Sequence, residues 1–70
     1  MKIIFTIHAE HRLKKRKITK EEVIEAIKYS RITLKKSDKY YAKRNVGRGI
    51  IEVVYEKTEN YIKVITAYWL

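Results

Sequence analysis

A histidine and two arginines near the start of the chain have types and spacing that fit chemistry on phosphate groups. On a helix, Arg12 lies one turn after His8, and Arg16 lies a further turn along at the edge of the same face. Imidazole titrates near neutral pH and can act as a general acid or base. A guanidinium can hold a phosphate with two parallel hydrogen bonds. The pattern favours His8 and Arg12 as the first catalytic candidates, followed by Arg16.

Hydroxyl groups in the second half of the chain add to this set. Tyr55, Thr66 and Tyr68 can supply hydroxyls from a sheet if their face meets the helix, and of these Tyr68 is the preferred catalytic candidate. A structural interpretation stays open for every one of these residues. His8 can cap or pack, Arg12 can pair with Glu52, and the hydroxyl residues can serve sheet packing. Any charged run is also commonly a solvated helix face.

Two helices are predicted to position the histidine and arginines. His11, expected to be exposed, and Lys15 share the face of His8 and Arg12, while Ala9 and Leu13 form the buried stripe of the first helix. Thr19 and Glu22 form a capping box, with Ile18 and Val23 placed as a hydrophobic staple. A second helix is therefore predicted over Lys20–Tyr29, with its apolar side turned to a sheet.

The rest of the chain is predicted to form that sheet. Lys2–Thr6 is a candidate short edge strand, and four more strands are predicted at Arg31–Lys36, Lys39–Val46, Ile50–Glu56 and Tyr61–Tyr68. Alternation predicts that Ile62, Val64, Thr66 and Tyr68 share one face of the last strand. The fold class is therefore α+β, with two helices packed on a four-stranded antiparallel sheet.

Composition points to a small basic domain. The chain has 70 residues, a net charge of +9 and no cysteine, so we expect a single domain over residues 1–70 without disulfides. No signal peptide or membrane-length apolar run is found, and a cytoplasmic location is expected. Because so short a chain has a small core, a partner or a homo-oligomer is expected to add stability.

The positive charge is concentrated in two segments. Residues 1–20 hold seven Lys or Arg and residues 31–48 hold another seven, with one acid in each segment. Such a surface suits a polyanion, and nucleic acid fits better than a membrane, while an acidic protein partner stays open. The candidate nucleic-acid-binding residues are Lys14, Lys15, Lys17, Tyr40, Tyr41, Lys43, Arg44 and Arg48.

No metal or cofactor is predicted. His8 and His11 are spaced for shared ligation on a helix, but no third ligand stands at motif spacing and the surroundings are basic. The turn at residues 47–49 is too short for a phosphate-binding loop, and no Ser-His-Asp or Cys-His pattern occurs.

The order of these motifs resembles a known group of proteins. His8-Ala9, Arg12, Arg16 and Ile18 precede the helix at residues 23–27, and a Tyr-rich basic strand then leads to IEVVY (51–55) and VITAY (64–68). Over nearly its whole length the chain resembles small prokaryotic domains grouped with the RelE/ParE and BrnT-like toxins. The resemblance implies a compact RelE-like fold with two helices against a four-stranded antiparallel sheet.

The resemblance also implies a function. Some relatives of this fold are metal-independent ribonucleases neutralised by a small antitoxin, whereas ParE-like relatives target gyrase and cleave nothing. We therefore expect an endoribonuclease of a toxin–antitoxin system that acts on RNA, with mRNA, on or off the ribosome, as the leading target. The alternative is a non-catalytic basic module that binds nucleic acid or an acidic protein.

Overall fold

Each helix begins at a threonine that caps free backbone amides. The structure, a computed structural model, describes residues 2–30 and 32–70. Helix α1 spans Ile7–Arg16, and the Thr6 hydroxyl accepts a hydrogen bond from the Ala9 amide at 3.0 Å. Helix α2 spans Lys20–Tyr29 behind the capping box, in which Thr19 and Glu22 exchange hydrogen bonds of 2.9 and 3.1 Å. The predicted cap and the bounds of the second helix are confirmed.

The two helices are joined at a residue whose backbone has the left-handed conformation. Lys17 has a φ of 57°, and the Ile18 amide donates back to the Leu13 carbonyl at 2.9 Å. Ile18 and Val23 are buried on either side of the cap, as the predicted staple requires. Because Lys17 carries a Cβ, this conformation costs about 1 kcal/mol that a glycine would avoid.

Within residues 2–30 and 32–70, five strands form one mixed sheet in the order β1-β5-β4-β3-β2. Their bounds are β1 Lys2–Phe5, β2 Ile32–Lys36, β3 Lys39–Asn45, β4 Ile50–Lys57 and β5 Tyr61–Trp69. Neighbouring strands are antiparallel except β1 and β5, which are parallel. The α+β class is confirmed, but the predicted four-stranded antiparallel sheet is wrong in strand number and in this pairing. Arg31, where the second predicted strand began, lies outside the described residues.

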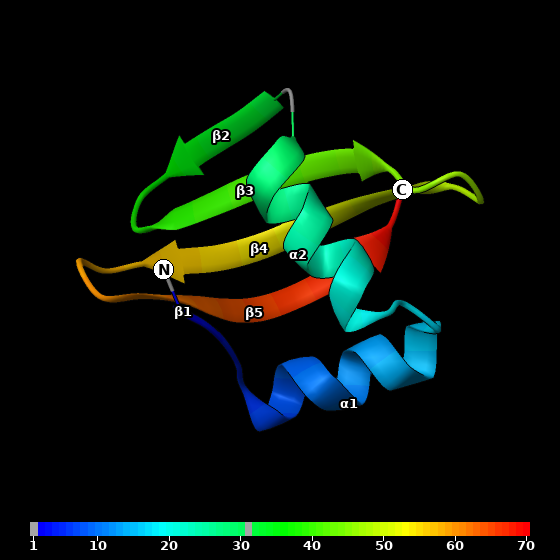
Figure 1. The fold of residues 1–70 in the computed structure, drawn as a ribbon, viewed down its shortest axis with the longest axis horizontal. Helices are drawn as coiled ribbons and strands as arrows, with labels where there is room; N and C mark the ends of the chain where they lie inside the picture. Colours follow the sequence, from blue (N-terminus) through cyan, green and yellow to red (C-terminus); the bar gives the residue numbers. More distant parts are fainter. Residues whose placement is uncertain (1, 31) are drawn as a thin grey trace.

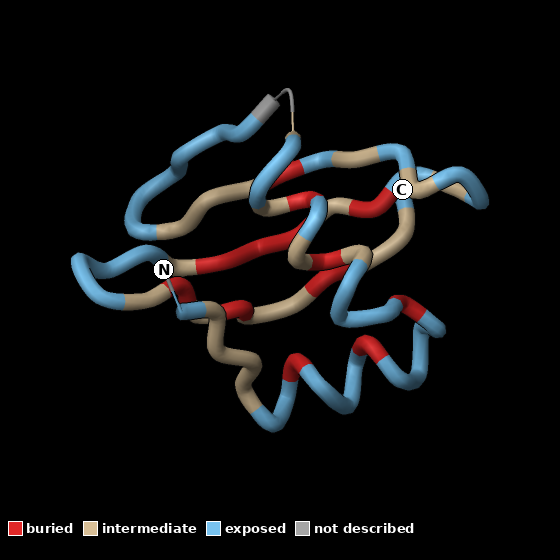
Figure 2. Tube along the Cα trace, viewed as in Figure 1, coloured by how far each residue is buried: buried red, intermediate tan, exposed pale blue. Residues whose placement is uncertain are grey.

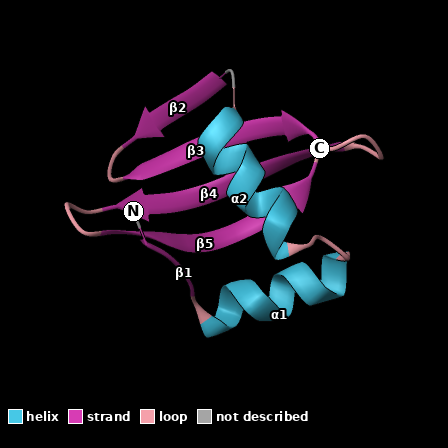
Figure 3. Ribbon diagram, viewed as in Figure 1, coloured by secondary structure: helices cyan, strands magenta, loops and turns pink. Residues whose placement is uncertain are grey.

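The first strand joins the sheet because it completes the core. Its register places Ile3 beside Ile62 and Phe5 beside Val64, so two apolar side chains pack against the buried cluster. Figure 1 shows α2 crossing one face of the sheet, over β3 and β4, while α1 lies alongside β5. Figure 3 shows the same arrangement by secondary structure. In Figure 2 the buried segments follow the central strands and the sides of the helices that meet them.

A bulge in β5 decides which of its side chains face the helices. Val54 pairs with Thr66 and Tyr55 pairs with Val64, so Ile65 is left as an extra residue. Val64 and Ala67 are therefore both fully buried under the helices. Thr66 and Tyr68 instead point to the opposite face of the sheet, which we call the open face. The prediction that Ile62, Val64, Thr66 and Tyr68 share one face is wrong, because strict alternation ends at Ile65.

No helix among residues 2–30 and 32–70 has the length and apolar character needed to cross a membrane.

Candidate functional site

His8, Arg12 and Arg16 form a row along the side of α1 that is turned away from α2. At about 100° per residue, Arg16, Arg12 and His8 lie about 20°, 60° and 100° from the buried Ala9, all in the same direction. Glu10 lies in the other direction, where its carboxylate binds the Lys20 ammonium of α2 at 2.7 Å. Since α2 covers one face of the sheet, the row is turned toward the open face.

The fold holds Arg16 at the edge of β5. One terminal nitrogen of its guanidinium donates to Thr66 Oγ1 at 3.2 Å and to the Ala67 carbonyl at 2.8 Å. The pairing of β5 with β1 ends at Val64, so Arg16 supplies a donor where no neighbouring strand does. The remaining N–H donors of the guanidinium make no hydrogen bond within the described residues, and they are available to an anion.

A tyrosine and a carboxylate pair on the same open face. Tyr68 on β5 lies opposite Glu52 on β4, and its hydroxyl donates to Glu52 Oε1 at 2.5 Å. This hydrogen bond, together with partial burial and the negative charge of Glu52, raises the pKa of Tyr68 to about 12, while Arg16 opposes the rise. The phenol therefore stays protonated at neutral pH and acts as a donor, and the carboxylate is the acceptor of the pair.

Arg16, Tyr68 and Glu52 are thus brought together, and we call them, with Thr66 and Tyr41, the open-face cluster. Thr66 and Tyr68 are two residues apart on one strand face, so the Arg16–Thr66 bond brings the guanidinium beside the phenol. Of the predicted catalytic residues, the cluster includes Arg16 and Tyr68. Glu52 was not predicted as a site residue, although it is the only charge in the apolar run at residues 50–55.

His8 and Arg12 are exposed on α1 and stand apart from the cluster. No hydrogen bond or ion pair within the described part of the chain involves either side chain. Arg12 does not pair with Glu52, whose carboxylate accepts from Tyr68 instead. At 1.5 Å per residue, His8 and Arg16 are about 12 Å apart along the helix axis. These residues are therefore spaced for successive groups of an extended ligand, not for one phosphate.

The predicted nucleic-acid-binding residues divide between surfaces. Lys14, Lys15 and Lys17 are exposed on or just after α1. Tyr41 and Lys43 lie on the open face, in register with Val54 and Glu52.

Two others lie on the face that α2 covers. Tyr40 stacks on Tyr55, with ring centroids 5.3 Å apart, and the Arg44 guanidinium lies 5.8 Å from the Tyr29 ring centroid. Tyr40 and Arg44 are therefore both in contact with other side chains of the protein.

Arg48 is held in a cluster that fixes the end of α1. It forms two hydrogen bonds with the Glu22 carboxylate, at 2.8 and 3.2 Å, and a third with the Lys17 carbonyl. Burial would raise the pKa of Glu22, but the hydrogen bonds from Thr19 and Arg48 outweigh it and lower that pKa. The Arg48 guanidinium also lies 4.8 Å from the Trp69 ring centroid, as in a cation–π contact. Its donors are largely used within the fold.

Trp69 connects this cluster to Arg16. The indole N–H donates to the Arg16 carbonyl at 2.7 Å, which holds the last turn of α1 against β5. Gly49 makes room for the indole, since a Cβ there would lie 3.0 Å from a ring carbon of Trp69. Arg48, Glu22 and Trp69, which we call the α1 clamp, therefore help to place Arg16 in the open-face cluster. The predictions from sequence did not include this role.

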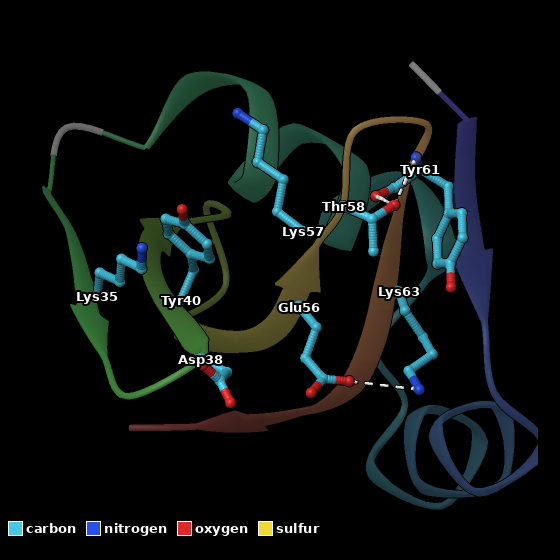
Figure 4. Close-up of a pocket in the computed structure, with 8 residues that line it drawn as sticks. All are labelled: Lys35, Asp38, Tyr40, Glu56, Lys57, Thr58, Tyr61 and Lys63. Carbon is cyan, nitrogen blue, oxygen red and sulfur yellow. Dashed lines mark hydrogen bonds and ion pairs between the residues drawn. The ribbon is translucent and has the colours of Figure 1, made fainter.

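A depression of about 350 Å³ lies elsewhere, at the end of the sheet, and is lined by residues of the β2–β3 and β4–β5 hairpins (Figure 4). Its lining residues are Lys35, Asp38, Tyr40, Glu56, Lys57, Thr58, Tyr61 and Lys63. The Lys63 ammonium pairs with Glu56 at 3.3 Å, and the Lys35 ammonium lies 5.6 Å from the Tyr40 ring centroid. Lys35, Glu56 and Lys63 already have partners there, and the open-face cluster is the better candidate for chemistry.

Among the described residues, no three His, Cys, Asp or Glu side chains come together as a metal site. Searches of curated proteins and of solved structures gave no match to the chain. One family profile matches residues 5–69, and it is described as a domain of unknown function, DUF4258. Since the match covers nearly the whole chain, this protein belongs to the DUF4258 family.

Proposed function

We propose that the chain is a metal-independent endoribonuclease of the toxin type, akin to the RelE/ParE and BrnT-like proteins, with mRNA as its leading target and a small antitoxin as its partner. The observation that carries the proposal is the meeting of Arg16, Glu52 and Tyr68 on the open face, where Tyr68 donates to Glu52 at 2.5 Å. A guanidinium can bind phosphate, a carboxylate can abstract a proton and a phenol can donate one.

The charge around the cluster suits an RNA strand. The chain carries a net charge of +9, and His8 and Arg12 continue from Arg16 along α1 at one-turn spacing. A strand laid along this row would place one phosphate at Arg16 and others near Arg12 and His8. Tyr41, on the open face, is available to stack on an unpaired base.

The groups can divide the cleavage reaction among them. The Glu52 carboxylate takes the proton of the ribose 2′-hydroxyl, and the 2′-oxygen attacks phosphorus as the bond from phosphorus to the 5′-oxygen breaks. Arg16 binds the charge that develops on the phosphoryl oxygens. Tyr68 gives its proton to the departing 5′-oxygen and regains one from the Glu52 carboxyl group. The products are a 2′,3′-cyclic phosphate and a free 5′-hydroxyl.

One observation favours the non-catalytic alternative, a basic module that holds RNA. Tyr68 and Glu52 satisfy each other, and Arg16 is bonded to Thr66 and Ala67, so the same contacts also stabilise the sheet. In that case phosphate affinity would come from the exposed lysines and arginines, and removal of Glu52 would leave binding intact.

The test is cleavage of single-stranded RNA by the purified protein in EDTA, with and without ribosomes. Wild type is compared with Glu52→Gln, His8→Ala and the matched control Glu56→Gln, which lies on the same strand and pairs with Lys63. RNA affinity is measured in parallel. Glu52→Gln should reduce the cleavage rate by about 100-fold or more, the lower range for a general base, with affinity unchanged.

The control Glu56→Gln should cleave at the wild-type rate, and the products should carry cyclic phosphate ends. Loss of cleavage in His8→Ala alone would move the reacting centre from the open face to α1. If no protein cleaves RNA under any condition while salt-sensitive binding persists, the chain is the binding module.

A further inference from the structure

The outer edge of the sheet at β2 has backbone groups that no strand of the described residues pairs with. Strand β2 is last in the sheet order, and within the described residues it pairs only with β3 (Figure 1). In an antiparallel pair, alternate residues direct their N–H and C=O groups away from the partner strand. Five residues, Ile32–Lys36, are thus a template for one more strand.

Exposed apolar side chains stand on both sides of this edge. Leu34, in register with Tyr41 on the open face, is 59% exposed. Tyr29, at the end of α2 on the other face, is 63% exposed and lies against Arg44. The opposite edge strand, β1, has four residues and none of the large apolar side chains that are exposed in this way. An added strand on β2 could therefore set alternate side chains against Leu34 and Tyr29.

The charge near this edge selects the kind of strand that fits. Lys35 and Lys36 belong to β2, Lys39 pairs with Lys36 across the hairpin, and Lys43 lies further along β3 in register with Ile32, with Asp38 as the nearby acid. Lys36 and Lys39 form a like-charge pair directly opposite each other. A second copy of this chain, itself of net charge +9, would bring its own β2 lysines to this edge. An acidic strand complements the positive charge of this edge, whereas charge repulsion opposes pairing with β2 of a second copy.

We propose that the free edge of β2 binds an extended acidic segment of another protein, which adds to the sheet as a sixth strand. Backbone hydrogen bonds hold the segment, Leu34 and Tyr29 receive its apolar side chains, and the lysines pair with its carboxylates. This site lies on the edge strand farthest from β5, which carries Tyr68. Leu34 is in register with Tyr41 of the open-face cluster, so the two sites adjoin, but strand addition at β2 does not require ribonuclease activity.

The test uses a fluorescent eight-residue peptide of alternating valine and glutamate, with fluorescence anisotropy as the readout on the full chain. Two further peptides carry N-methyl groups on alternate residues, one on the odd-numbered and the other on the even-numbered positions. Each of them thus lacks the N–H donors along one edge of the extended peptide. The protein variants are Lys36→Glu, which relieves the like-charge pair with Lys39, and Lys14→Glu, which makes the same charge change on α1. Circular dichroism confirms that each variant is folded.

Lys36→Glu should weaken peptide binding by about tenfold, because a favourable pair becomes a repulsive one. Lys14→Glu should change binding by less than about twofold at physiological salt, where charges beyond ~8 Å are screened. One methylation frame should abolish binding and the other should leave it intact. Equal weakening by both variants, or binding that neither methylation frame affects, would overturn the proposal in favour of charge attraction alone. No binding of the unmethylated peptide would overturn it as well.

Discussion

Replacement of Tyr68 by phenylalanine should remove a pH-dependent part of the stability of this protein. The phenol has a pKa of about 12 in the folded chain, against an ordinary value of 10.0, because it donates to Glu52. A raised pKa means that the folded state favours the protonated phenol. The resulting stabilisation is fully present below about pH 10 and is lost as the pH rises toward about 12.

The size of the effect follows from the shift. At 1.36 kcal/mol per pKa unit, a rise of two units corresponds to about 2.7 kcal/mol. The pair is partly exposed, and solvent screening reduces its net contribution to about 1–1.5 kcal/mol. Tyr68→Phe should therefore lower the free energy of unfolding by that amount near neutral pH, and by less as the pH approaches the folded pKa.

The assay is urea unfolding of wild type and Tyr68→Phe at several values between about pH 8 and pH 11, followed by circular dichroism. The ultraviolet difference spectrum of the two proteins reports the titration of Tyr68 directly. Glu52→Gln provides the control, since a double-mutant cycle should show that the two substitutions are strongly non-additive. Additive effects, or a titration of Tyr68 at its ordinary pKa, would refute the assigned hydrogen bond and its energy.

Three further predictions concern the elements that place the cluster. Lys17→Gly should raise the free energy of unfolding by up to about 1 kcal/mol, because Lys17 has a φ of 57°; urea unfolding measures this, and a loss of stability would contradict it. Trp69→Phe should lower stability by about 1 kcal/mol through loss of the bond to the Arg16 carbonyl, and hydrogen exchange should quicken in the last turn of α1 but not in α2. Deletion of Ile65 should leave the native fold in place, because it removes the extra residue while residues 62–64 and 66–68 keep their faces; loss of the native thermal transition in the deletion variant would contradict this account of the bulge.

Local patterns in the sequence were sufficient for much of the fold. The capping box at Thr19 and Glu22 depends on residues three apart, so the start of α2 could be predicted without any distant contact. The buried stripe of Ala9 and Leu13 follows from helical periodicity, and the alternation of Tyr40, Ala42 and Arg44 follows from strand periodicity. Helical periodicity also allowed Arg16 to be predicted as a site residue, because it lies one turn after Arg12.

Features that depend on distant pairing were decided only by the tertiary structure. The parallel placement of β1 beside β5 joins the two ends of the chain, and the extra residue at Ile65 exists only relative to the register of β4. That register turns Tyr68 to the open face and sets its hydroxyl against Glu52, so the key pair of the cluster has no local signature. Sequence by itself determined the helices, the strands and the basic character of this protein, because each depends on residue type and short-range periodicity. The tertiary structure decided which of its polar groups meet, because that depends on how strands far apart in the chain align.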